Sequence, residues 1–258
     1  MKAVNFDFYQ PASVEEAVDR LSDRTIFTKI LSGGQSLCPM MNFRLVRPDL
    51  VVDISRLETL QQINLIGDGI RIGSGVTHSR LEDGEVNGKT GAYLRKVASG
   101  IAYRAVRTRG TMGGSVAHAD PSAEIPTVLV ALGGEIVASS SNGDRTIPAK
   151  DFFLGAFFTE LDEREIIKLI RIPKEQENSG SAFVEFAPRH GDFAIVGIAA
   201  VISQNDAGDI DSVRLVVAGV DGKPLDVSSE ADSLIGKENV TLDSFDEVAQ
   251  NVFKRVEP

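Results

Sequence analysis

The chain has 258 residues, a formal net charge of -10, 42% hydrophobic residues and 25% charged residues. This length predicts two or three compact units, and the near-average composition excludes a disordered or fibrous protein. The acidic balance argues against nucleic acid as the main partner, because clustered lysines and arginines carry most of the binding to phosphate backbones.

The single cysteine and the lack of long apolar segments restrict the location. Cys38 alone can form neither an internal disulfide nor an iron–sulfur site, which is typical of a reducing compartment, and we expect it to be a packed small side chain. No stretch reaches the roughly twenty apolar residues of a membrane span. We therefore expect a cytoplasmic protein with no membrane span.

The first predicted unit covers residues 1–57. Ser13, three residues before Glu16, forms a capping-box pattern that predicts the start of a helix. The expected elements are an edge strand within 6–12 that runs into a proline turn, a helix at 13–22, strands at 28–31 and 50–54, and a helix or irregular segment at 35–44. Because the spacing G-x-G-x-x-G is missing, the pattern does not indicate a Rossmann unit.

The second predicted unit covers residues 58–174 and mixes short strands with helices. The apolar run 125–132 should be a helix closed by Gly133 and Gly134, because glycine after an apolar run is the usual C-cap signal. The expected strands are 60–65, 69–73, 75–77, 135–138, 145–147 and 165–173, and a second helix is expected at 91–103. Segment 111–124 is expected to be a loop. Four phenylalanines are expected in the core: Phe152, Phe153, Phe157 and Phe158.

The third predicted unit covers residues 180–258, after a charged, glycine- and serine-rich linker at 174–181. Its expected elements are a three-stranded antiparallel sheet of strands 182–186, 195–203 and 211–220, followed by helices at 228–235 and 243–255. The whole chain is thus predicted to have an α+β fold.

Two glycine pairs, each followed by a serine, are the main functional signal. They lie in Ser32-Gly33-Gly34-Gln35-Ser36 and in Thr111-Met112-Gly113-Gly114-Ser115. Paired glycines allow close backbone approach, and their N–H groups beside hydroxyls form nests for phosphate. Two nests suit a pyrophosphate, with Asp120 and Glu124 as acceptors for ribose or ribityl hydroxyls. A plain turn between strand and helix is the alternative for the first loop.

The same two loops carry a family resemblance. Ser32 to Ser36 and Thr111 to Glu124 resemble the two FAD-binding motifs of the medium, flavin-carrying subunit of molybdenum hydroxylases, the family of aerobic carbon monoxide dehydrogenase and xanthine dehydrogenase. Phe6 to Pro11 and Arg189 to Ala194 extend the resemblance over essentially the whole chain. It implies an FAD-binding fold of the vanillyl-alcohol-oxidase type, with two α+β subdomains that hold the flavin and a C-terminal α+β domain.

The resemblance also implies which residues bind FAD. Lys29 to Ser36 would wrap the pyrophosphate, the second motif would hold the phosphates, ribityl chain and ring edge, and segment 183–193 would approach the isoalloxazine. The implied cofactor-binding residues are Lys29, Ile30, Leu31, Ser32, Gly33, Gly34, Gln35, Ser36, His78, Thr111, Gly114, Ser115, His118, Asp120, Glu124 and Ile167. No catalytic residue and no metal ligand are implied on this chain.

Three other features are open or depart from the family pattern. The run Arg104, Arg107 and Arg109 either flanks a phosphate or forms a solvated or subunit-facing edge. Glu185 stands where many relatives carry lysine, so a cationic contact to the flavin is in doubt there. The chain ends at Pro258, where relatives usually continue through another helical stretch, so a truncated tail and a natural short form are both open.

The expected function is that of an FAD-binding electron-transfer subunit in a heteromeric oxidoreductase. Electrons would come from iron–sulfur clusters on a small partner subunit, hydroxylation would occur at the molybdenum cofactor of a large partner subunit, and the acceptor would be NAD, quinone or oxygen. One alternative is a stand-alone FAD oxidase or reductase, for which only Arg189, His190 and Asp192 are eligible catalytic residues. The other is a nucleotide-binding module without redox activity. Carbon monoxide, a purine, an aldehyde and a nitrogen heteroaromatic are all left open as substrates.

Overall fold

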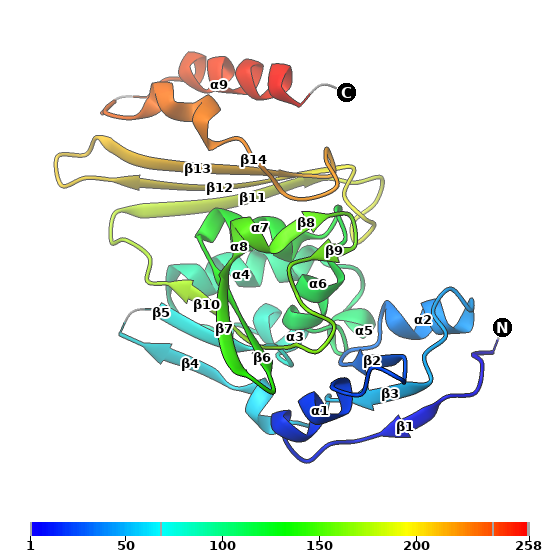
Figure 1. The fold of residues 1–258 in the computed structure, drawn as a ribbon. Helices are drawn as coiled ribbons and strands as arrows, with labels where there is room; N and C mark the ends of the chain where they lie inside the picture. Colours follow the sequence, from blue (N-terminus) through cyan, green and yellow to red (C-terminus); the bar gives the residue numbers. More distant parts are fainter. Residues whose placement is uncertain (1, 68, 239, 257–258) are drawn as a thin grey trace.

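Three large sheets organise the chain, one in each of three successive lobes (Figure 1). The computed structural model describes residues 2–67, 69–238 and 240–256. The N-terminal and middle sheets lie within the predicted ranges 1–57 and 58–174, and the C-terminal sheet begins at Ser179, one residue before the predicted 180–258. Each lobe combines helices with a sheet, so the expected α+β class is confirmed.

The N-terminal lobe is a small parallel sheet covered by one helix. Its strands lie in the order β1 (Asp7–Tyr9), β3 (Leu50–Asp53) and β2 (Thr28–Leu31), and its helices are α1 (Val14–Leu21) and α2 (Leu37–Asn42). The predicted start of α1 is confirmed, but only one of the two hydrogen bonds of a capping box forms, because the Glu16 carboxylate binds the residue before the N-cap. The Ser13 hydroxyl accepts a hydrogen bond from the Glu16 N–H (3.2 Å), and the Glu16 carboxylate accepts one from the Ala12 N–H (2.6 Å).

The middle lobe is built on a five-stranded antiparallel sheet whose last strand in sequence lies at its centre. The spatial order is β4 (Ile63–Ile66), β5 (Gly69–Gly73), β10 (Ile166–Pro173), β6 (Glu135–Ser140) and β7 (Gly143–Pro148). Its other elements are η1 (Glu58–Gln61), α3 (His78–Glu82), α4 (Gly88–Gly100), α5 (Arg104–Arg107), α6 (Met112–His118), α7 (Glu124–Leu132), α8 (Ala149–Phe152) and the hairpin of β8 (Phe153–Gly155) and β9 (Phe158–Thr159).

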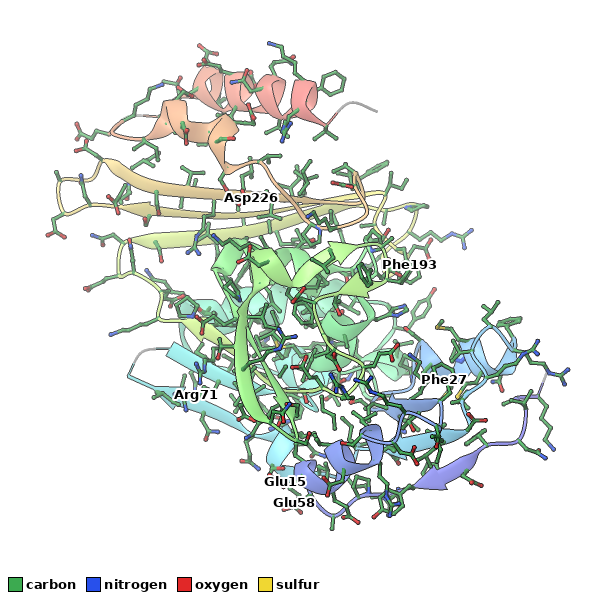
Figure 2. The ribbon with its side chains drawn as sticks, viewed as in Figure 1. Glu15, Phe27, Glu58, Arg71, Phe193 and Asp226 are labelled. Atoms are coloured by element: carbon green, nitrogen blue, oxygen red, sulfur yellow. The ribbon has the colours of Figure 1, made fainter. Side chains whose placement is uncertain are left out.

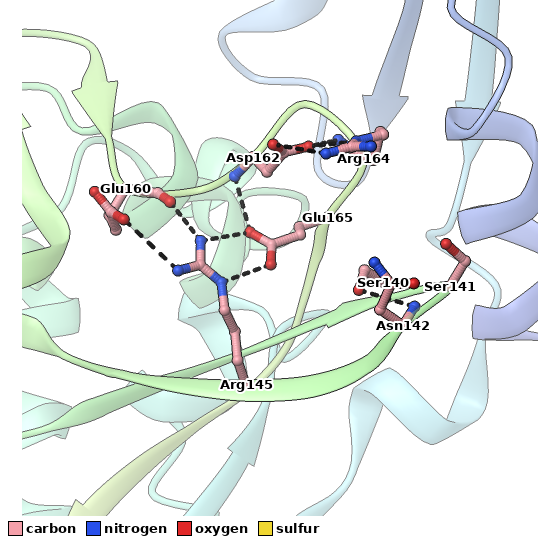
Figure 3. Close-up of a pocket in the computed structure, with 8 residues that line it drawn as sticks. All are labelled: Ser140, Ser141, Asn142, Arg145, Glu160, Asp162, Arg164 and Glu165. Atoms are coloured by element: carbon pink, nitrogen blue, oxygen red, sulfur yellow. Dashed lines mark hydrogen bonds and ion pairs between the residues drawn. The ribbon is translucent and has the colours of Figure 1, made fainter.

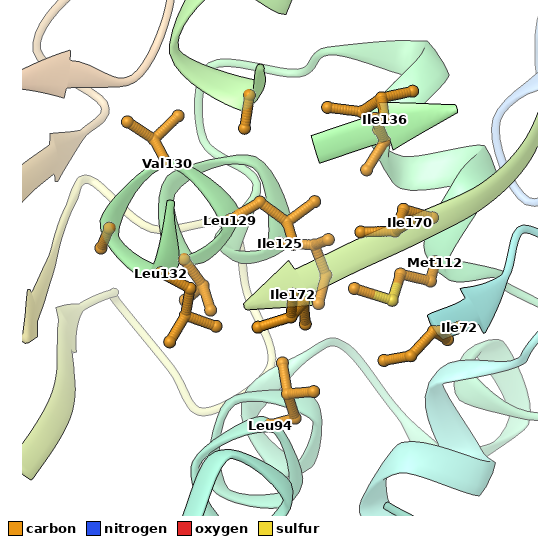
Figure 4. Close-up of a cluster of buried hydrophobic side chains, with 14 of the residues drawn as sticks. Ile72, Leu94, Met112, Ile125, Leu129, Val130, Leu132, Ile136, Ile170 and Ile172 are labelled. Carbon is orange, nitrogen blue, oxygen red and sulfur yellow. The ribbon is translucent and has the colours of Figure 1, made fainter. Parts of the chain in front are cut away.

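Helix α7 lies at the centre of the main hydrophobic core (Figure 4). Every residue from Ile125 to Leu132 is buried, because the middle sheet contacts one side of the helix and the C-terminal sheet contacts another. The helix ends at Gly133, whose φ of 64° is left-handed, as the glycine C-cap predicts. Its burial joins the middle and C-terminal lobes through one shared core.

The C-terminal lobe is an antiparallel sheet with one face on the core. Its order is β11 (Ser179–Phe186), β12 (Val196–Gln204), β13 (Ile210–Ala218) and β14 (Leu225–Asp226), so a short fourth strand joins the three that were predicted. The sheet packs on α4 and α7, while η2 (Ser228–Leu234) and α9 (Leu242–Arg255) lie on its other side (Figure 1). Within the described ranges, no helix combines the length and apolar composition needed to cross a membrane.

Several local expectations were wrong. Residues 75–77 form no strand. The strand that pairs with β5 on that side is β10, and the chain after β5 turns into α3 at His78 instead. Most of the expected loop 111–124 is helical, as α6 and the start of α7. The helix expected at 91–103 ends at Gly100, where α5 soon follows. Phe157 and Phe158 are 60% and 62% exposed instead of buried, and Cys38 is exposed instead of packed.

Candidate functional site

The first glycine loop connects β2 to α2 and presents free backbone donors. Gly34 has a φ of 72°, a left-handed conformation that favours glycine. Among the described residues, no oxygen accepts a hydrogen bond from the N–H groups of 33–36, and the carbonyl of Gly34 accepts one from the Cys38 N–H at 3.1 Å. Consecutive unpaired N–H groups in a turn form a concave anion site, so this loop fits a phosphate.

The two predicted loops meet although they belong to different lobes. A Cβ at position 33 would lie 2.2 Å from the Arg109 carbonyl oxygen, so only glycine permits this approach of the two backbones. Next to this contact, the hydroxyl oxygens of Ser32, one residue before Gly33, and Thr111, two residues after Arg109, lie 3.0 Å apart. The predicted convergence of the two loops on one place is therefore present in the structure.

The second loop begins a short helix whose own donors are already used. The Thr111 hydroxyl accepts from the Gly114 N–H at 3.0 Å and caps α6, while the N–H groups of Met112 and Gly113 donate to Val76 and Ser74. A second nest of free N–H groups is therefore absent, and that expectation was wrong for 112–114. What this segment can offer a ligand is the hydroxyl groups and the small glycine surface.

Gly113 has a packing reason to be glycine. A Cβ there would lie 2.3 Å from the Ser74 Cβ, so α6 can approach the end of β5 only without a side chain at this position. At Gly114 a Cβ would meet only the Thr111 hydroxyl, at 2.8 Å. Gly113 thus shapes the interior, whereas Gly114 protects the cap of α6.

His78 lies directly beneath the junction of the loops. Its N–H donates to the Gly110 carbonyl at 2.9 Å, and a Cβ at Gly110 would lie 2.9 Å from its ring. The side chain is buried and its Nδ1 has no hydrogen-bond partner within the described residues. Burial, assisted by the positive charge of Arg107, lowers the pKa of His78 to about 4, so the ring is neutral at pH 7.

His118 is the last residue of α6, and the turn that follows it contains a residue with a positive φ. Ala119 and Phe157 have φ values of 50° and 57°, and the Phe157 N–H donates to the Ala119 carbonyl at 3.0 Å. The rings of His118 and Phe157 are tilted, with centroids 5.0 Å apart. Partial burial lowers the pKa of His118, and the nearby charge of Asp120 opposes that shift. Non-glycine residues held at positive φ cluster at functional sites.

Three carboxylates gather where the C-terminal lobe meets the start of α7. Burial, with the charges of Glu185 and Asp120, raises the pKa of Glu124 to about 7. Glu185 enters from β11 and has one buried oxygen without a partner among the described residues, while Asp120 accepts from the Ser122 N–H at 2.9 Å. The lobes touch here, since the Gly219 N–H donates to the Pro121 carbonyl at 3.0 Å. A hydroxyl-rich ligand is the kind of group that such acceptors hold.

The other predicted cofactor residues have mixed positions. Ile30 packs into the N-terminal core and Ile167 belongs to the buried cluster that supports α6, so both shape the site from behind. The Lys29 ammonium lies over the Phe27 ring, with its nitrogen 5.2 Å from the ring centroid. Gln35 is exposed, and its amide donates weakly to the Gly33 carbonyl at 3.4 Å.

The basic run before the second loop is largely used in ion pairs. Arg107 is buried and forms two hydrogen bonds with Glu82 (2.8 and 2.9 Å), and Arg104 pairs with Glu82 and Asp83. Arg109 is exposed and forms no ion pair within the described residues. Of the three arginines, only Arg109 is therefore available to a phosphate.

A polar pocket of about 400 Å³ lies away from both loops, at the turn of the β6–β7 hairpin (Figure 3). Its charges pair internally: Arg145 bonds Glu165 at 2.6 and 2.8 Å, and Arg164 bonds Asp162 at 2.8 Å. Because both arginines are already paired and the carboxylates of the lining outnumber them, this pocket does not compete with the loops as a site for phosphate groups. In the described part of the chain, no group of three or more His, Cys, Asp or Glu side chains could hold a metal ion.

Three contributors to the site were not predicted from the sequence. Ser74 and Gly110 support the second loop, and Phe157 lies against His118. The triplet Gly73-Ser74-Gly75 was a usable signal, because glycines flanking a serine mark a close approach of backbones. Nothing local distinguishes Phe157 from the core phenylalanines before it.

These features fit FAD. The free donors at 33–36 suit its phosphates, the carboxylates Asp120 and Glu124 suit hydroxyl groups of a ribose or ribityl chain, and glycine at 33 and 34 leaves the backbone accessible. In Figure 2, Phe27 of the N-terminal lobe and Phe193 of the C-terminal lobe both lie on the right-hand side of the view.

Comparisons with known proteins agree with this geometry. Residues 4–175 match the family model described as "FAD binding domain in molybdopterin dehydrogenase", and residues 181–258 match "CO dehydrogenase flavoprotein C-terminal domain". The chain is 39% identical over 219 residues to the 6-hydroxypseudooxynicotine dehydrogenase complex subunit alpha of Paenarthrobacter nicotinovorans, covering 85% of this chain and 74% of that protein. It is 37% identical to the caffeine dehydrogenase subunit beta of a Pseudomonas species, covering 92% and 80%.

Solved structures are similar over the whole chain. Carbon monoxide dehydrogenase from Hydrogenophaga pseudoflava superposes with a TM-score of 0.93 at 32% identity, covering 100% of this chain and 89% of that one. Quinoline 2-oxidoreductase from Pseudomonas putida 86 superposes with a TM-score of 0.91 at 33% identity, with the same coverage.

Proposed function

The chain belongs to the family of FAD-binding subunits of molybdopterin dehydrogenases, and on this premise we propose that it transfers electrons between a partner subunit and an external acceptor. It is a flavoprotein subunit of an oxidoreductase of the molybdenum hydroxylase type. FAD, when bound, supplies redox chemistry that can accept electrons from one side and release them to another. The task of the chain's own residues is to bind, orient and shield that cofactor.

The meeting of Ser32 and Thr111 carries the assignment of the binding site. Because the two lobes touch there, a ligand that spans both lobes has fixed groups on each side. We assign the N–H groups of 33–36 to the FAD pyrophosphate and the acceptors Asp120 and Glu124 to its hydroxyl groups. His118 and Ser115 lie between these two regions on α6 and complete the proposed contact surface.

The partners follow from the family. The relatives are named as subunits of dehydrogenase complexes, and we propose that this chain likewise joins a small iron–sulfur subunit and a large molybdenum subunit. The acceptor of the electrons is NAD, quinone or oxygen. We also propose a cytoplasmic location, because a single cysteine is typical of a protein from a reducing compartment.

A stand-alone oxidase is less well supported. Its eligible residues Arg189, His190 and Asp192 lie in the β11–β12 loop, where the first two side chains are exposed. The only hydrogen bond that joins them within the described residues runs from the Asp192 N–H to the Arg189 carbonyl. They therefore form no acid–base arrangement of their own.

The test is purification of the chain alone and together with the two neighbouring subunits. The isolated chain should bind FAD and show a flavin absorption spectrum, but substrate should not bleach that spectrum. The reconstituted complex should show substrate-dependent bleaching and recovery with acceptor. Failure to bind FAD would overturn the site, whereas bleaching of the isolated chain by substrate would favour the stand-alone oxidase.

A further inference from the structure

A loop at the outer end of the N-terminal lobe displays large apolar side chains to solvent. This Phe43 loop, residues 43–47, follows α2, and Figure 1 shows that helix at the periphery of the lobe. Phe43 is 63% exposed and Leu45 is 74% exposed. Isolated exposed apolar residues are ordinary, but here two lie two positions apart on one short segment.

The loop is held in place by its own hydrogen bonds. The N–H groups of Phe43 and Leu45 donate to the carbonyls of Pro39 and Met40, each at 2.9 Å. The Arg44 guanidinium donates to the Lys2 carbonyl at 3.3 Å. Arg44 also has a φ of 61°, a left-handed conformation that is strained for a non-glycine residue. A fixed and strained loop that presents Phe43 and Leu45 to water suggests a use for that display.

A second exposed pair lies beside the segment that leaves this loop. Ile26 is 38% exposed and Phe27 is 47% exposed, and Figure 2 labels Phe27 at the same end of the lobe. The Phe27 N–H donates to the Asp49 carboxylate at 3.0 Å, and the Asp49 N–H donates back to the Phe27 carbonyl at 2.9 Å. The apolar display therefore extends beyond the loop itself.

The charge of this end of the lobe differs from that of the chain. The exposed cations of the region, Arg44, Arg47 and Lys29, outnumber its exposed carboxylate Asp49, although the chain as a whole has a net charge of -10. In a symmetric contact between two copies of the chain, this loop of one copy would face the same loop of the other. Like charges would then meet, which is unfavourable. An acidic surface with an apolar pocket is the complementary partner, since arginine and aromatic side chains dominate the energetics of protein interfaces.

We propose that the Phe43 loop is the docking surface for the iron–sulfur subunit, whose facing surface is acidic and holds an apolar pocket for Phe43 and Leu45. This inference rests on the proposed function, which supplies the partner. The position of the loop favours that subunit, because α2 alone separates it from the first glycine loop. A subunit docked on this loop lies beside the proposed cofactor site, on the side of the loop that we assign to the pyrophosphate.

The test uses the full chain, expressed with its neighbouring iron–sulfur and molybdenum subunits, and a binding titration with the purified iron–sulfur subunit. The double variant Phe43→Ser/Leu45→Ser and the variant Arg47→Glu should each weaken binding by about tenfold or more. Their flavin content and melting temperature should stay at wild-type values. Matched controls are Leu65→Ser, a 60% exposed leucine on β4, and Lys96→Glu on α4, which should bind like wild type.

The following results would each contradict the proposed docking surface, and they can be distinguished from one another. Wild-type affinity in both variants would show that the loop is not part of the interface. Selective loss of the molybdenum subunit would show that the loop contacts that subunit instead of the iron–sulfur subunit. Loss of flavin in the double variant places the loop in the cofactor site. If wild type binds flavin but neither subunit, the heteromeric part of the proposed function fails as well. Loss of self-association in the variants would assign the loop to a contact between copies of this chain.

Discussion

The hydroxyl oxygens of Ser32 and Thr111 lie 3.0 Å apart and join the N-terminal lobe to the middle lobe at the candidate flavin site. Each hydroxyl lies at the end of a regular element: Ser32 follows β2, and Thr111 caps α6. The positions of the two candidate FAD-binding loops relative to one another therefore depend on a few contacts at this junction. Changes at these contacts should reduce flavin affinity without touching either lobe's core.

Gly33→Ala tests the close approach of the two loops. The new Cβ would lie 2.2 Å from the Arg109 carbonyl oxygen, and because that atom belongs to the backbone, the lobes must separate. We expect FAD affinity to fall at least about tenfold and the free energy of unfolding to fall by about 1–3 kcal/mol. Fluorescence titration with FAD and thermal unfolding of the flavin-free protein measure the two effects.

The matched control for that variant is Gly180→Ala. Gly180 lies on β11, and a Cβ there has no neighbour within 4 Å. It should retain wild-type flavin affinity and stability. If Gly33→Ala behaves like Gly180→Ala, the two loops do not form one binding site.

Thr111→Ala should show that one hydroxyl serves both lobes. The change removes the cap of α6 and the contact with Ser32, and each loss is worth about 1 kcal/mol. Thr111→Ser should retain most of the stability, because it keeps the oxygen. A double-mutant cycle with Ser32→Ala isolates the contact between lobes, for which we expect a coupling free energy of about 0.5–1.5 kcal/mol. A coupling of zero in urea unfolding would mean that the hydrogen bond adds nothing to stability.

Elements that are encoded by neighbouring residues could be predicted from the sequence. The capping-box pattern of Ser13 and Glu16 determines where α1 begins, and Gly133 determines where α7 ends. The strands of the C-terminal sheet are short apolar runs separated by turn residues, such as Asn205 to Gly208 between β12 and β13, so their existence was also predictable. The two glycine motifs indicated a binding site for the same reason, since each signal lies within a few residues.

Features that depend on distant contacts could not be predicted in this way. Gly113 and Gly114 argue against a helix by propensity, yet α6 forms because Gly113 packs on Ser74 and Thr111 caps it. Likewise β10 occupies the centre of the middle sheet although it follows the other strands in sequence. The hydrogen bonds that the N–H groups of 112–114 donate within the protein could not be predicted for the same reason.

His78 should make the flavin-free protein sensitive to acid. Its pKa is near 4 in the folded protein, compared with 6.5 as the ordinary value, so the unfolded chain binds more protons between these pH values. The stability from His78 is therefore complete above pH 6.5 and is lost as the pH falls towards 4, by up to about 3 kcal/mol. In His78→Gln the loss of melting temperature between pH 7 and pH 4.5 should be smaller than in wild type. An unchanged pH profile would show that His78 does not control this sensitivity.

Glu124 should have the opposite pH dependence. Its pKa is raised from 4.5 to about 7 in the folded protein, mainly by burial and then by the charges of Glu185 and Asp120. The folded state therefore binds more protons than the unfolded state between these values, and stability falls as the pH rises from 4.5 to 7, by up to about 3 kcal/mol. Above pH 7 the full penalty of the buried charge is present.

Glu124→Gln removes this penalty while keeping the shape of the side chain. The flavin-free variant should be more stable than wild type at pH 8 and should match it at pH 4.5, as measured by urea unfolding at the two values. Glu185→Gln should produce part of the gain at pH 8, because it removes one of the two charges that act on Glu124. If Glu124 also accepts a hydrogen bond from an FAD hydroxyl, Glu124→Gln should bind FAD more weakly even though it is the more stable protein. A gain in both stability and affinity would separate the carboxylate from the cofactor site, since a neutral amide oxygen accepts a weaker hydrogen bond from a hydroxyl group than a charged carboxylate does.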